Sequence, residues 1–411
     1  MLKGKKSVRY IFFIFLIYML IFQNFLQMNF EIFKYFDELL ALAFFPIFLL
    51  VKLKSENKFL FNKNNLKIVI LLLIIIVTGL LQNIKYEYQL SNYYLTDLLI
   101  FLKFFLVYFL SKELFDIKFI NQNKKSINMH VKIIAFILLS FSICNYLFVL
   151  FPAPKRFGIM VNQLFFEHPT YLAGDLIFLL VLYYITSEKN KFDITILYIC
   201  ILICSTLRIK AIGGVAIAIM IIGYCNIKNK KITFSKLSIF VIIAVLIGIP
   251  QLEYYFSTAG TARKELLEKS IDIAKDYFPF GTGFGTYGTF VTGKSYSPIY
   301  YMYGLSEIWG LTPESPGFVS DGFWYAIIGQ FGFLGLICYL SILYIIIKRI
   351  QREYTIENKK IYAGKVISMM YLLICSTSEA AFFSPIAIPL ALIIGVYSKL
   401  DERKDGNVKN N

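Results

Sequence analysis

Long apolar runs, separated by short lysine-containing segments, extend along most of the chain. The runs at 68–81 and 237–249 each approach the roughly 20 residues with which a helix crosses a bilayer. Lipid offers no hydrogen-bond partner to free backbone groups, so segments that span a membrane in this way form helices. The pattern therefore predicts an all-α, polytopic integral membrane protein.

The predicted spans form a single membrane domain over residues 1–411, without an internal repeat or a soluble domain. The first apolar run follows Lys3, Lys5, Lys6 and Arg9 and has no small-residue cleavage site, so we interpret it as a retained helix and not as a signal peptide. We expect about twelve transmembrane helices, at 9–26, 37–52, 67–84, 95–111, 132–151, 170–186, 192–206, 210–226, 236–250, 322–347, 361–377 and 383–399.

Composition excludes several classes of protein. Hydrophobic residues make up 58% of the chain and aromatic residues 18%, and a soluble protein of this size would have to place many of them on its surface. The net charge of +16 does not indicate a nucleic-acid partner, because the lysines lie between apolar runs and not on one soluble face. All six cysteines lie in apolar runs, with no disulfide framework and no metal-ligand spacing. We therefore expect neither a metal site nor a cofactor.

Lysine and arginine are distributed unequally between alternate connecting segments. Of 42 such residues, 29 lie at the two termini and in the segments 52–67, 112–132, 187–192, 226–236 and 348–360, and 11 lie in the opposite connections. Positive charge is enriched in cytoplasmic connections. We therefore expect a multi-pass protein of the plasma (inner) membrane with both termini in the cytoplasm.

The opposite connections then face outside, and one of them is much longer than the rest. Residues 251–321 form a single extracytoplasmic loop of 71 residues. Long loops in compact proteins are usually functional. We therefore expect the active face of the protein to be extracytoplasmic.

Three exterior arginines run against the charge bias of this topology: Arg156, Arg208 and Arg263. The planar guanidinium group suits phosphate, because it donates two parallel hydrogen bonds. Contact with lipid headgroups is the alternative for each arginine taken singly.

Arg263 opens a segment, 262–278, that has the periodicity of an amphipathic helix. Arg263 is alone among the charged residues of this segment in falling on the apolar half of the helix. It also lies near the helix N-terminus, where the helix dipole disfavours a cation. An inward-facing anion would explain this position, and a frayed first turn is the alternative.

The same exterior loop continues into a glycine-rich run at 278–288 and then into many aromatic residues. Alternating glycines allow tight turns and close backbone approach, but the run lacks the strand-to-helix context of a nucleotide site. We expect Tyr287, Tyr301 and Trp309 to bind glycan, because aromatic rings offer flat apolar surfaces to sugar faces. Anchoring at the membrane interface is the alternative for each ring.

Few exterior side chains can act as an acid or a base. His168 precedes a predicted helix, Asp175 lies two turns further on the same face, and Asp321 and Glu379 lie at the outer ends of their helices. An acid inside a spanning helix is costly and is usually functional or paired. Our candidates for a catalytic base are His168, Asp321 and Glu379, in that order.

Several short motifs follow one another in an order and spacing that resemble a known family. They are Arg156-Phe157-Gly158, His168-Pro169-Thr170-Tyr171-Leu172-Ala173-Gly174, Arg208 before Gly213-Gly214, Ala262-Arg263 through the glycine-rich run, Ser320-Asp321-Gly322-Phe323-Trp324, and Gly332-Phe333-Leu334-Gly335. Over roughly residues 130–400 the chain resembles the Wzy-type O-antigen and capsular polysaccharide polymerases, which share a superfamily with the O-antigen ligases.

The resemblance implies a metal-independent membrane glycosyltransferase that polymerises polyprenyl-diphosphate-linked oligosaccharide repeat units into a cell-surface polysaccharide. It implies that Arg156, Arg208 and Arg263 hold the diphosphate, and that membrane lipid, a flippase and a chain-length regulator are further partners. Around Arg208 the family more often has Ser-Arg-Gly, whereas this chain has Leu207-Arg208-Ile209.

Two other functions stay open from the sequence. An O-antigen ligase-type transferase would move glycan to a different acceptor, but the ligase branch carries a histidine in its large exterior loop and residues 251–321 contain none. A lipid-linked oligosaccharide flippase or another transporter would usually show internal repeats and interrupted helices, which the sequence does not show clearly. The polymerase is therefore favoured.

We predict that residues 251–321 lie outside the cell and both termini inside, because of the lysine distribution. In intact cells, an impermeant thiol reagent should label a Ser295→Cys variant and leave a Lys409→Cys variant unlabelled. Labelling of Lys409→Cys alone, with both proteins expressed, would overturn this topology.

Overall fold

The computed structural model places most of the chain; the residues that it describes are 7–40, 63–188, 193–233, 235–239 and 261–397, with the single positions 42, 43, 46 and 242. Almost all regular structure in these residues is helical. Seven of the described helices are long and apolar enough to cross a membrane. The chain is thus an all-α, polytopic membrane protein, which confirms the class predicted from the apolar pattern.

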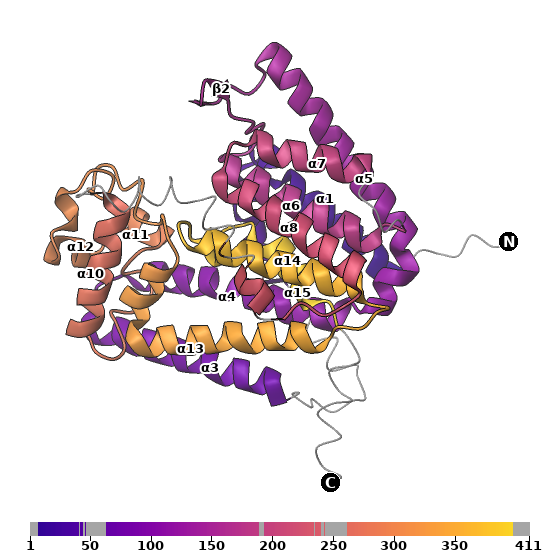
Figure 1. Cartoon of the computed structure of the whole chain (residues 1–411). Helices are drawn as coiled ribbons and strands as arrows, with labels where there is room; N and C mark the ends of the chain where they lie inside the picture. The colour runs from indigo at the N-terminus through magenta and orange to yellow at the C-terminus, as the bar shows by residue number, and fades with distance from the viewer. Residues whose placement is uncertain are drawn as a thin grey trace, which may run out of the picture.

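The elements follow one another along the chain as labelled in Figure 1. Their bounds are α1 Val8–Gln27, η1 Glu31–Tyr35, α3 Lys63–Tyr86, α4 Ser91–Leu114, α5 Ile117–Phe148, β1 Lys155–Arg156, β2 Ile159–Met160, α6 Pro169–Thr186, α7 Ile194–Ser205, α8 Ile209–Lys228, α10 Ala262–Asp276, α11 Phe290–Lys294, α12 Pro298–Met302, η2 Leu305–Glu307, α13 Trp324–Arg352, α14 Lys359–Ser376, η3 Ala381–Phe383 and α15 Ala387–Gly395.

Most predicted spans coincide with helices of the structure, within a few residues at each end. The span predicted at 132–151 begins too late, because α5 also includes the polar residues from Ile117 onwards. Asp116 starts this helix, since its carboxylate accepts a hydrogen bond from the backbone N–H of Phe119 (2.7 Å). The spans predicted at 37–52 and 236–250 lie mostly outside the described residues.

The prediction of a last full span at 383–399 is wrong. The chain forms the short 3₁₀ turn η3 and then α15, which has only 9 residues. At 1.5 Å per residue this helix is about 14 Å long, roughly half the thickness of a bilayer core. It is buried against α4 and α14. Ser111 Oγ donates to the carbonyl of Leu392 (2.5 Å) and Lys365 Nζ to that of Val396, so carbonyls at its end are bonded within the protein.

Helix α6 occupies the centre of the bundle. In α6, 94% of the most apolar 18-residue window is buried, compared with 33% in α3. Helices α5, α7, α8 and α14 pack around α6. Helix α3 instead exposes Ile70, Leu73 and Val77, a row of apolar side chains that lipid surrounds more favourably than water. Helix α6 is therefore enclosed by other helices over most of its length.

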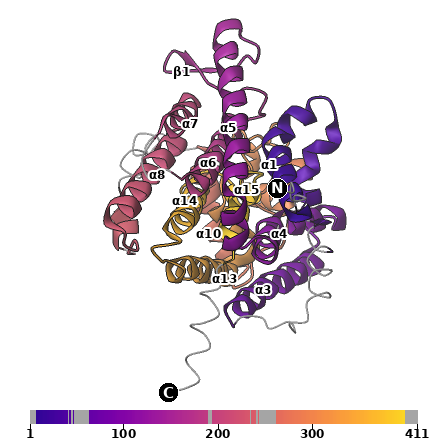
Figure 2. The ribbon, with the colours of Figure 1, turned by 90° about the vertical axis from the view of Figure 1, so that its right-hand side faces the viewer.

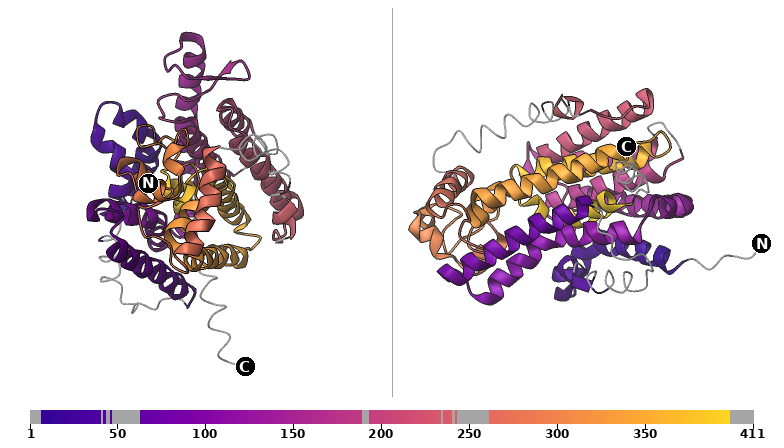
Figure 3. Two further views of the ribbon diagram at one scale, coloured as in Figure 1. Left: turned by 90° about the vertical axis from the view of Figure 1, so that its left-hand side faces the viewer. Right: turned by 90° about the horizontal axis from the view of Figure 1, so that it is seen from below.

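Residues 261–321, which are the described part of the loop predicted to be exterior, form a helical layer at one end of the bundle (Figures 1 and 3). It contains α10, α11, α12 and η2. Helix α10 packs against α13, and α13 lies along α3. The layer is thus attached mainly to the first half of α13.

A break in α13 joins this layer to the bundle. Gly332 has φ 62° and ψ −163°, which interrupts the helical hydrogen bonds around it. The glycine-rich run bonds the freed groups: Gly283 N donates to Gln330 O (2.8 Å), and Leu334 N donates to Pro279 O (3.1 Å). From Gly281 to Gly288 the run is buried, so its glycines serve close backbone contact between two segments of the protein and leave no open loop for phosphate there.

The C-terminal end of α5 extends beyond the rest of the bundle, and the hairpin β1–β2 follows it (Figure 2). The two strands pair antiparallel, with Lys155 opposite Met160 and Arg156 opposite Ile159. The turn residue Phe157 is 82% exposed. The hairpin leads the chain back towards the start of α6.

We predict that Gly332→Ala destabilises the protein by about 1–3 kcal/mol, because the φ and ψ angles of Gly332 are accessible almost only to glycine. An added Cβ would also lie 2.4 Å from Pro279 O. The measurement is the melting temperature in detergent. Gly223→Ala in α8 is the matched control, since no atom lies within 4 Å of its added Cβ. Equal melting temperatures for the two variants would contradict the prediction.

Candidate functional site

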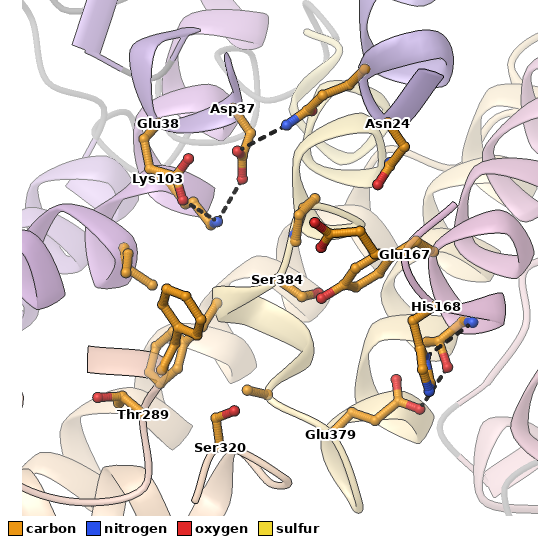
Figure 4. A pocket seen from close by; sticks show the side chains of 18 of the residues that line it. Asn24, Asp37, Glu38, Lys103, Glu167, His168, Thr289, Ser320, Glu379 and Ser384 are labelled. Carbon is orange, nitrogen blue, oxygen red and sulfur yellow. Dashed lines mark hydrogen bonds and ion pairs between the residues drawn. The ribbon is translucent and has the colours of Figure 1, made fainter. Parts of the chain in front are cut away.

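A pocket of about 440 Å³ lies where segments far apart in the sequence meet (Figure 4). Its walls include the end of α1, the start of α6, part of the segment between α10 and α13, and the connection between α14 and α15. The charge pattern of the sequence assigns all four of these regions to the exterior side. Their meeting at one pocket supports that common assignment, while the direction in which the pocket faces stays a prediction.

His168, Asp321 and Glu379, the three predicted candidates for a base, all line this pocket. His168 is the N-cap residue of α6, followed by Pro169 at the first helical position. Asp321 lies three residues before α13, and Glu379 lies between α14 and η3. The structure therefore brings together three residues that the sequence could only name separately.

Both ring nitrogens of His168 face hydrogen-bond donors. Nδ1 lies 3.3 Å from the backbone N–H of Thr170, and Nε2 lies 2.5 Å from the guanidinium of Arg208. A neutral ring can accept a hydrogen bond at one of these nitrogens, whereas a protonated ring would present an N–H to both donors, so the neutral ring is favoured. Loss of surrounding water, reinforced by the charge of Arg208, lowers the pKa of His168 to about 4.

Asp321 forms an ion pair with Arg263, whose guanidinium donates to Asp321 Oδ2 at 2.7 Å. The Arg263 side chain is 17% exposed, compared with 64% for Lys275 near the other end of α10. Arg263 therefore points inward, as its position on the apolar half of the helix predicts, and its observed anion is a carboxylate. Burial raises the pKa of Asp321 even though Arg263 opposes this effect.

Glu379 is held by two groups from other helices. Lys210 Nζ, from the first turn of α8, donates to Glu379 Oε1 at 2.5 Å, and the Thr170 hydroxyl donates to the same oxygen at 3.2 Å. Lys210 lies two residues after Arg208, and no role was predicted for it from the sequence. Its charge against the topology bias was the signal that could have identified it.

These residues form one charged cluster beside the pocket, which we call the His168 cluster: Arg156, His168, Arg208, Lys210, Arg263, Asp321 and Glu379. The pKa of His168 is lowered by the positive charges of Arg156, Arg208 and Lys210. The positive charges of Arg263 and Lys210 likewise oppose the rise in the pKa of Asp321. Four cations and two carboxylates, with a neutral histidine, leave a formal charge of +2. The arginines and the lysine contact or lie near the lining side chains without lining the pocket themselves.

The three predicted glycan-binding aromatics do not line this pocket. The ring of Tyr287 is completely buried, and its hydroxyl donates to the Leu266 carbonyl at 2.6 Å. This ring packs the interior of the layer formed by residues 261–321. Tyr301 and Trp309 are 58% and 78% exposed, but both lie outside the pocket lining in the part of the chain that is described.

A second polar group lines the pocket that sequence reasoning did not assign. It contains Asp37 and Glu38, which follow η1, and Lys103 in α4. A lysine within an apolar helix signals a buried partner, but the sequence could not say which acid pairs with it. Asp97 of the same helix instead accepts a hydrogen bond from the backbone N–H of Gly285 (2.8 Å).

Within the described residues, no group of three or more histidine, cysteine, aspartate or glutamate side chains has the arrangement of a metal site. The fold and the pocket together define a helical membrane protein with a charged cavity lined by helices and by the segments that connect them. No protein-family model matches the chain, and no curated protein matches it significantly. Its activity therefore has to be argued from the site.

We predict that His168 makes the protein less stable as the pH falls. The unfolded chain has a histidine pKa of 6.5 and the folded protein one of about 4, so the neutral form is favoured by folding and stability is lost between these values. As the pH is lowered from 7 to 4.5, the melting temperature of His168→Gln should rise relative to that of the wild type, because the variant lacks the group that becomes protonated. A difference between the two proteins that is independent of pH would contradict the shift.

Proposed function

We propose that the protein is a polysaccharide polymerase, which transfers a glycan from its polyprenyl diphosphate to a hydroxyl group of another lipid-linked repeat unit. The single observation that carries the proposal is the +2 formal charge of the His168 cluster beside a pocket within a membrane protein. A diphosphate diester carries about two negative charges, so it matches this cluster in sign and size.

In the proposed reaction, the bond between the first carbon of the donor glycan and a diphosphate oxygen breaks. A bond forms between that carbon and the acceptor oxygen, the acceptor proton moves to a carboxylate, and polyprenyl diphosphate leaves. Arg208, Lys210 and Arg263 stabilise the charge of the departing diphosphate, and Arg156 adds to the positive field around it. The chemistry uses only side chains of the protein.

Asp321 is a better candidate for the base than His168, which reverses the order predicted from the sequence. The ring nitrogens of His168 face Thr170 and Arg208, so neither is offered to an acceptor hydroxyl. Asp321 lines the pocket and has a raised pKa, which strengthens it as a base. Glu379 is held by Lys210 and Thr170 and keeps the cluster assembled.

The ion pair between Arg263 and Asp321 gives the two residues a coupled role. An arriving diphosphate competes with Asp321 for the guanidinium of Arg263. Once Arg263 turns to the diphosphate, the carboxylate of Asp321 loses its cation and becomes more basic. Substrate binding thus releases the base at the moment when it is needed.

The proposal places the reaction on the exterior face of the plasma membrane, with a flippase and a chain-length regulator as partners of the polymerase. A ligase-type transferase would use the same diphosphate chemistry with another acceptor. The polymerase is preferred because the exterior loop lacks the histidine of the ligase branch. A flippase would not require a carboxylate that is released by its substrate.

We predict that Arg263→Ala lowers the rate of chain extension by about tenfold or more. Each charge-assisted hydrogen bond to the diphosphate contributes roughly 1.5–3 kcal/mol, and about 1.4 kcal/mol corresponds to a factor of ten in rate. Arg263→Lys should recover part of the activity, because an ammonium group cannot reproduce the guanidinium fork. The assay is polymer length on a gel, with the amount of membrane-inserted protein measured in parallel.

Lys275→Ala is the matched control on the exposed side of α10 and should have little effect. Asp321→Asn separates binding from catalysis: it should abolish extension and bind polyprenyl diphosphate at least as tightly as the wild type, since the competitor for Arg263 is gone. Normal polymer from Arg263→Ala at normal protein level would refute the proposal, and so would an Asp321→Asn variant that polymerises normally.

A further inference from the structure

A second set of charged and amide side chains lines the same pocket, on the side opposite His168 and Glu379 (Figure 4). Lys103 Nζ donates to Asp37 Oδ2 at 2.6 Å and to Glu38 Oε1 at 3.2 Å, and Gln23 donates to Asp37 Oδ1 at 3.3 Å. Lys103 and Asp37 are each only 1% exposed. We call these four residues the Lys103 cluster.

The need to neutralise a lysine inside an apolar helix does not by itself explain which residues form this cluster. A lysine inside an apolar helix is costly and needs an anionic partner, and Asp37 alone neutralises it. Glu38 adds a second carboxyl group, which the charge of Lys103 does not require. Its Oε2 atom is buried and accepts no hydrogen bond from any residue that the structure describes. A buried acceptor without a donor is destabilising, so a ligand that donates a hydrogen bond would compensate for it.

The groups next to this cluster suit a ligand that carries hydroxyl groups. Asn24 and Gln27, from the last turns of α1, line the pocket with amides that both donate and accept. Gln27 also donates to Glu167 Oε1 at 2.6 Å, which fixes another carboxylate at the wall. Tyr171 and Phe383 add aromatic rings to the lining, and such rings can pack against the apolar face of a sugar.

We propose that the Lys103 cluster, with Asn24 and Gln27, is the subsite for the sugar residue attached to the diphosphate. The proposal rests on the function proposed above and adds to it the position of the glycan. The single cation of the Lys103 cluster is paired with carboxyl groups and offers no surplus positive charge to phosphate, whereas the His168 cluster attracts it. A glycosyl diphosphate, anionic at one end and rich in hydroxyl groups at the other, therefore binds in a single orientation.

The size of the pocket agrees with this occupant. Its volume of about 440 Å³ lies within the roughly 300–1,000 Å³ of pockets that enclose small ligands. The glycan is then recognised at this subsite, and not at Tyr287, Tyr301 and Trp309 as predicted from the sequence. Its specificity would come from Glu38 and the two amides, which are the groups able to distinguish hydroxyl positions.

The experiment compares two probes that share the same lipid diphosphate. The first is the lipid-linked single repeat unit extracted from membranes of cells that lack this protein, and the second is bare polyprenyl diphosphate. Binding of each probe to purified full-length protein in nanodiscs is measured for the wild type, Glu38→Gln, Asn24→Ala and Arg263→Ala. Glu188→Gln is the control, because this carboxylate is 67% exposed and pairs only loosely with Lys125 at 3.8 Å.

We expect the wild type to bind the glycan-bearing lipid more tightly than the bare lipid. Glu38→Gln keeps the size of the side chain but places an N–H donor where the free acceptor was, so it should reduce this preference by about tenfold. Asn24→Ala should reduce it as well, and in both variants the affinity for bare polyprenyl diphosphate should be unchanged. Arg263→Ala should lower the affinity for both probes equally, and Glu188→Gln should change the affinity for neither.

An unchanged preference in both Glu38→Gln and Asn24→Ala, at normal protein level, overturns the subsite and leaves the proposed function standing. An equal loss of affinity for both probes in these two variants also overturns it, since that result indicates general damage. A wild type that binds neither probe overturns the proposed function, and the subsite with it.

Discussion

The break in α13 at Gly332 is the constraint on which the position of the site depends. A helix interrupted inside a membrane protein leaves backbone groups that lipid cannot satisfy, and the glycine-rich run bonds them through Pro279 and Gly283. This junction fixes the layer formed by residues 261–321 to the bundle. It holds α10 against α13, so that Arg263 from one helix meets Asp321 just before the other.

Ion pairs between segments also determine how charge is distributed around the pocket. Three lining acids form ion pairs with residues from other segments: Asp321 with Arg263, Glu379 with Lys210, and Glu38 with Lys103. The cations exceed the carboxylates in the His168 cluster, whereas the single lysine of the Lys103 cluster is matched by carboxyl groups. A ligand with one anionic end and one neutral end is the kind of molecule that such a pocket orients.

The sequence predicts the helical membrane class, most of the spans and the inward direction of Arg263, because all three follow from local periodicity. It names His168, Asp321 and Glu379, but it does not predict that their cationic partners include Lys210, since that contact joins residues 169 positions apart. Tyr287 shows a different limit. Aromatic content alone does not tell a ring that packs an interior from one that faces a ligand, and only the surrounding helices decide this.

The short length of α15 bears on how the protein is assembled. A helix of 9 residues is too short to leave the insertion machinery and settle in lipid unaided, because both of its ends would expose backbone groups within the bilayer. Its packing partners α4 and α14, and the donors Ser111 and Lys365 that bond its carbonyls, all precede it in the chain. Those helices are therefore synthesised first and can form the cavity that receives α15. The position of this short segment is thus set by polar side chains of helices that come before it in the chain.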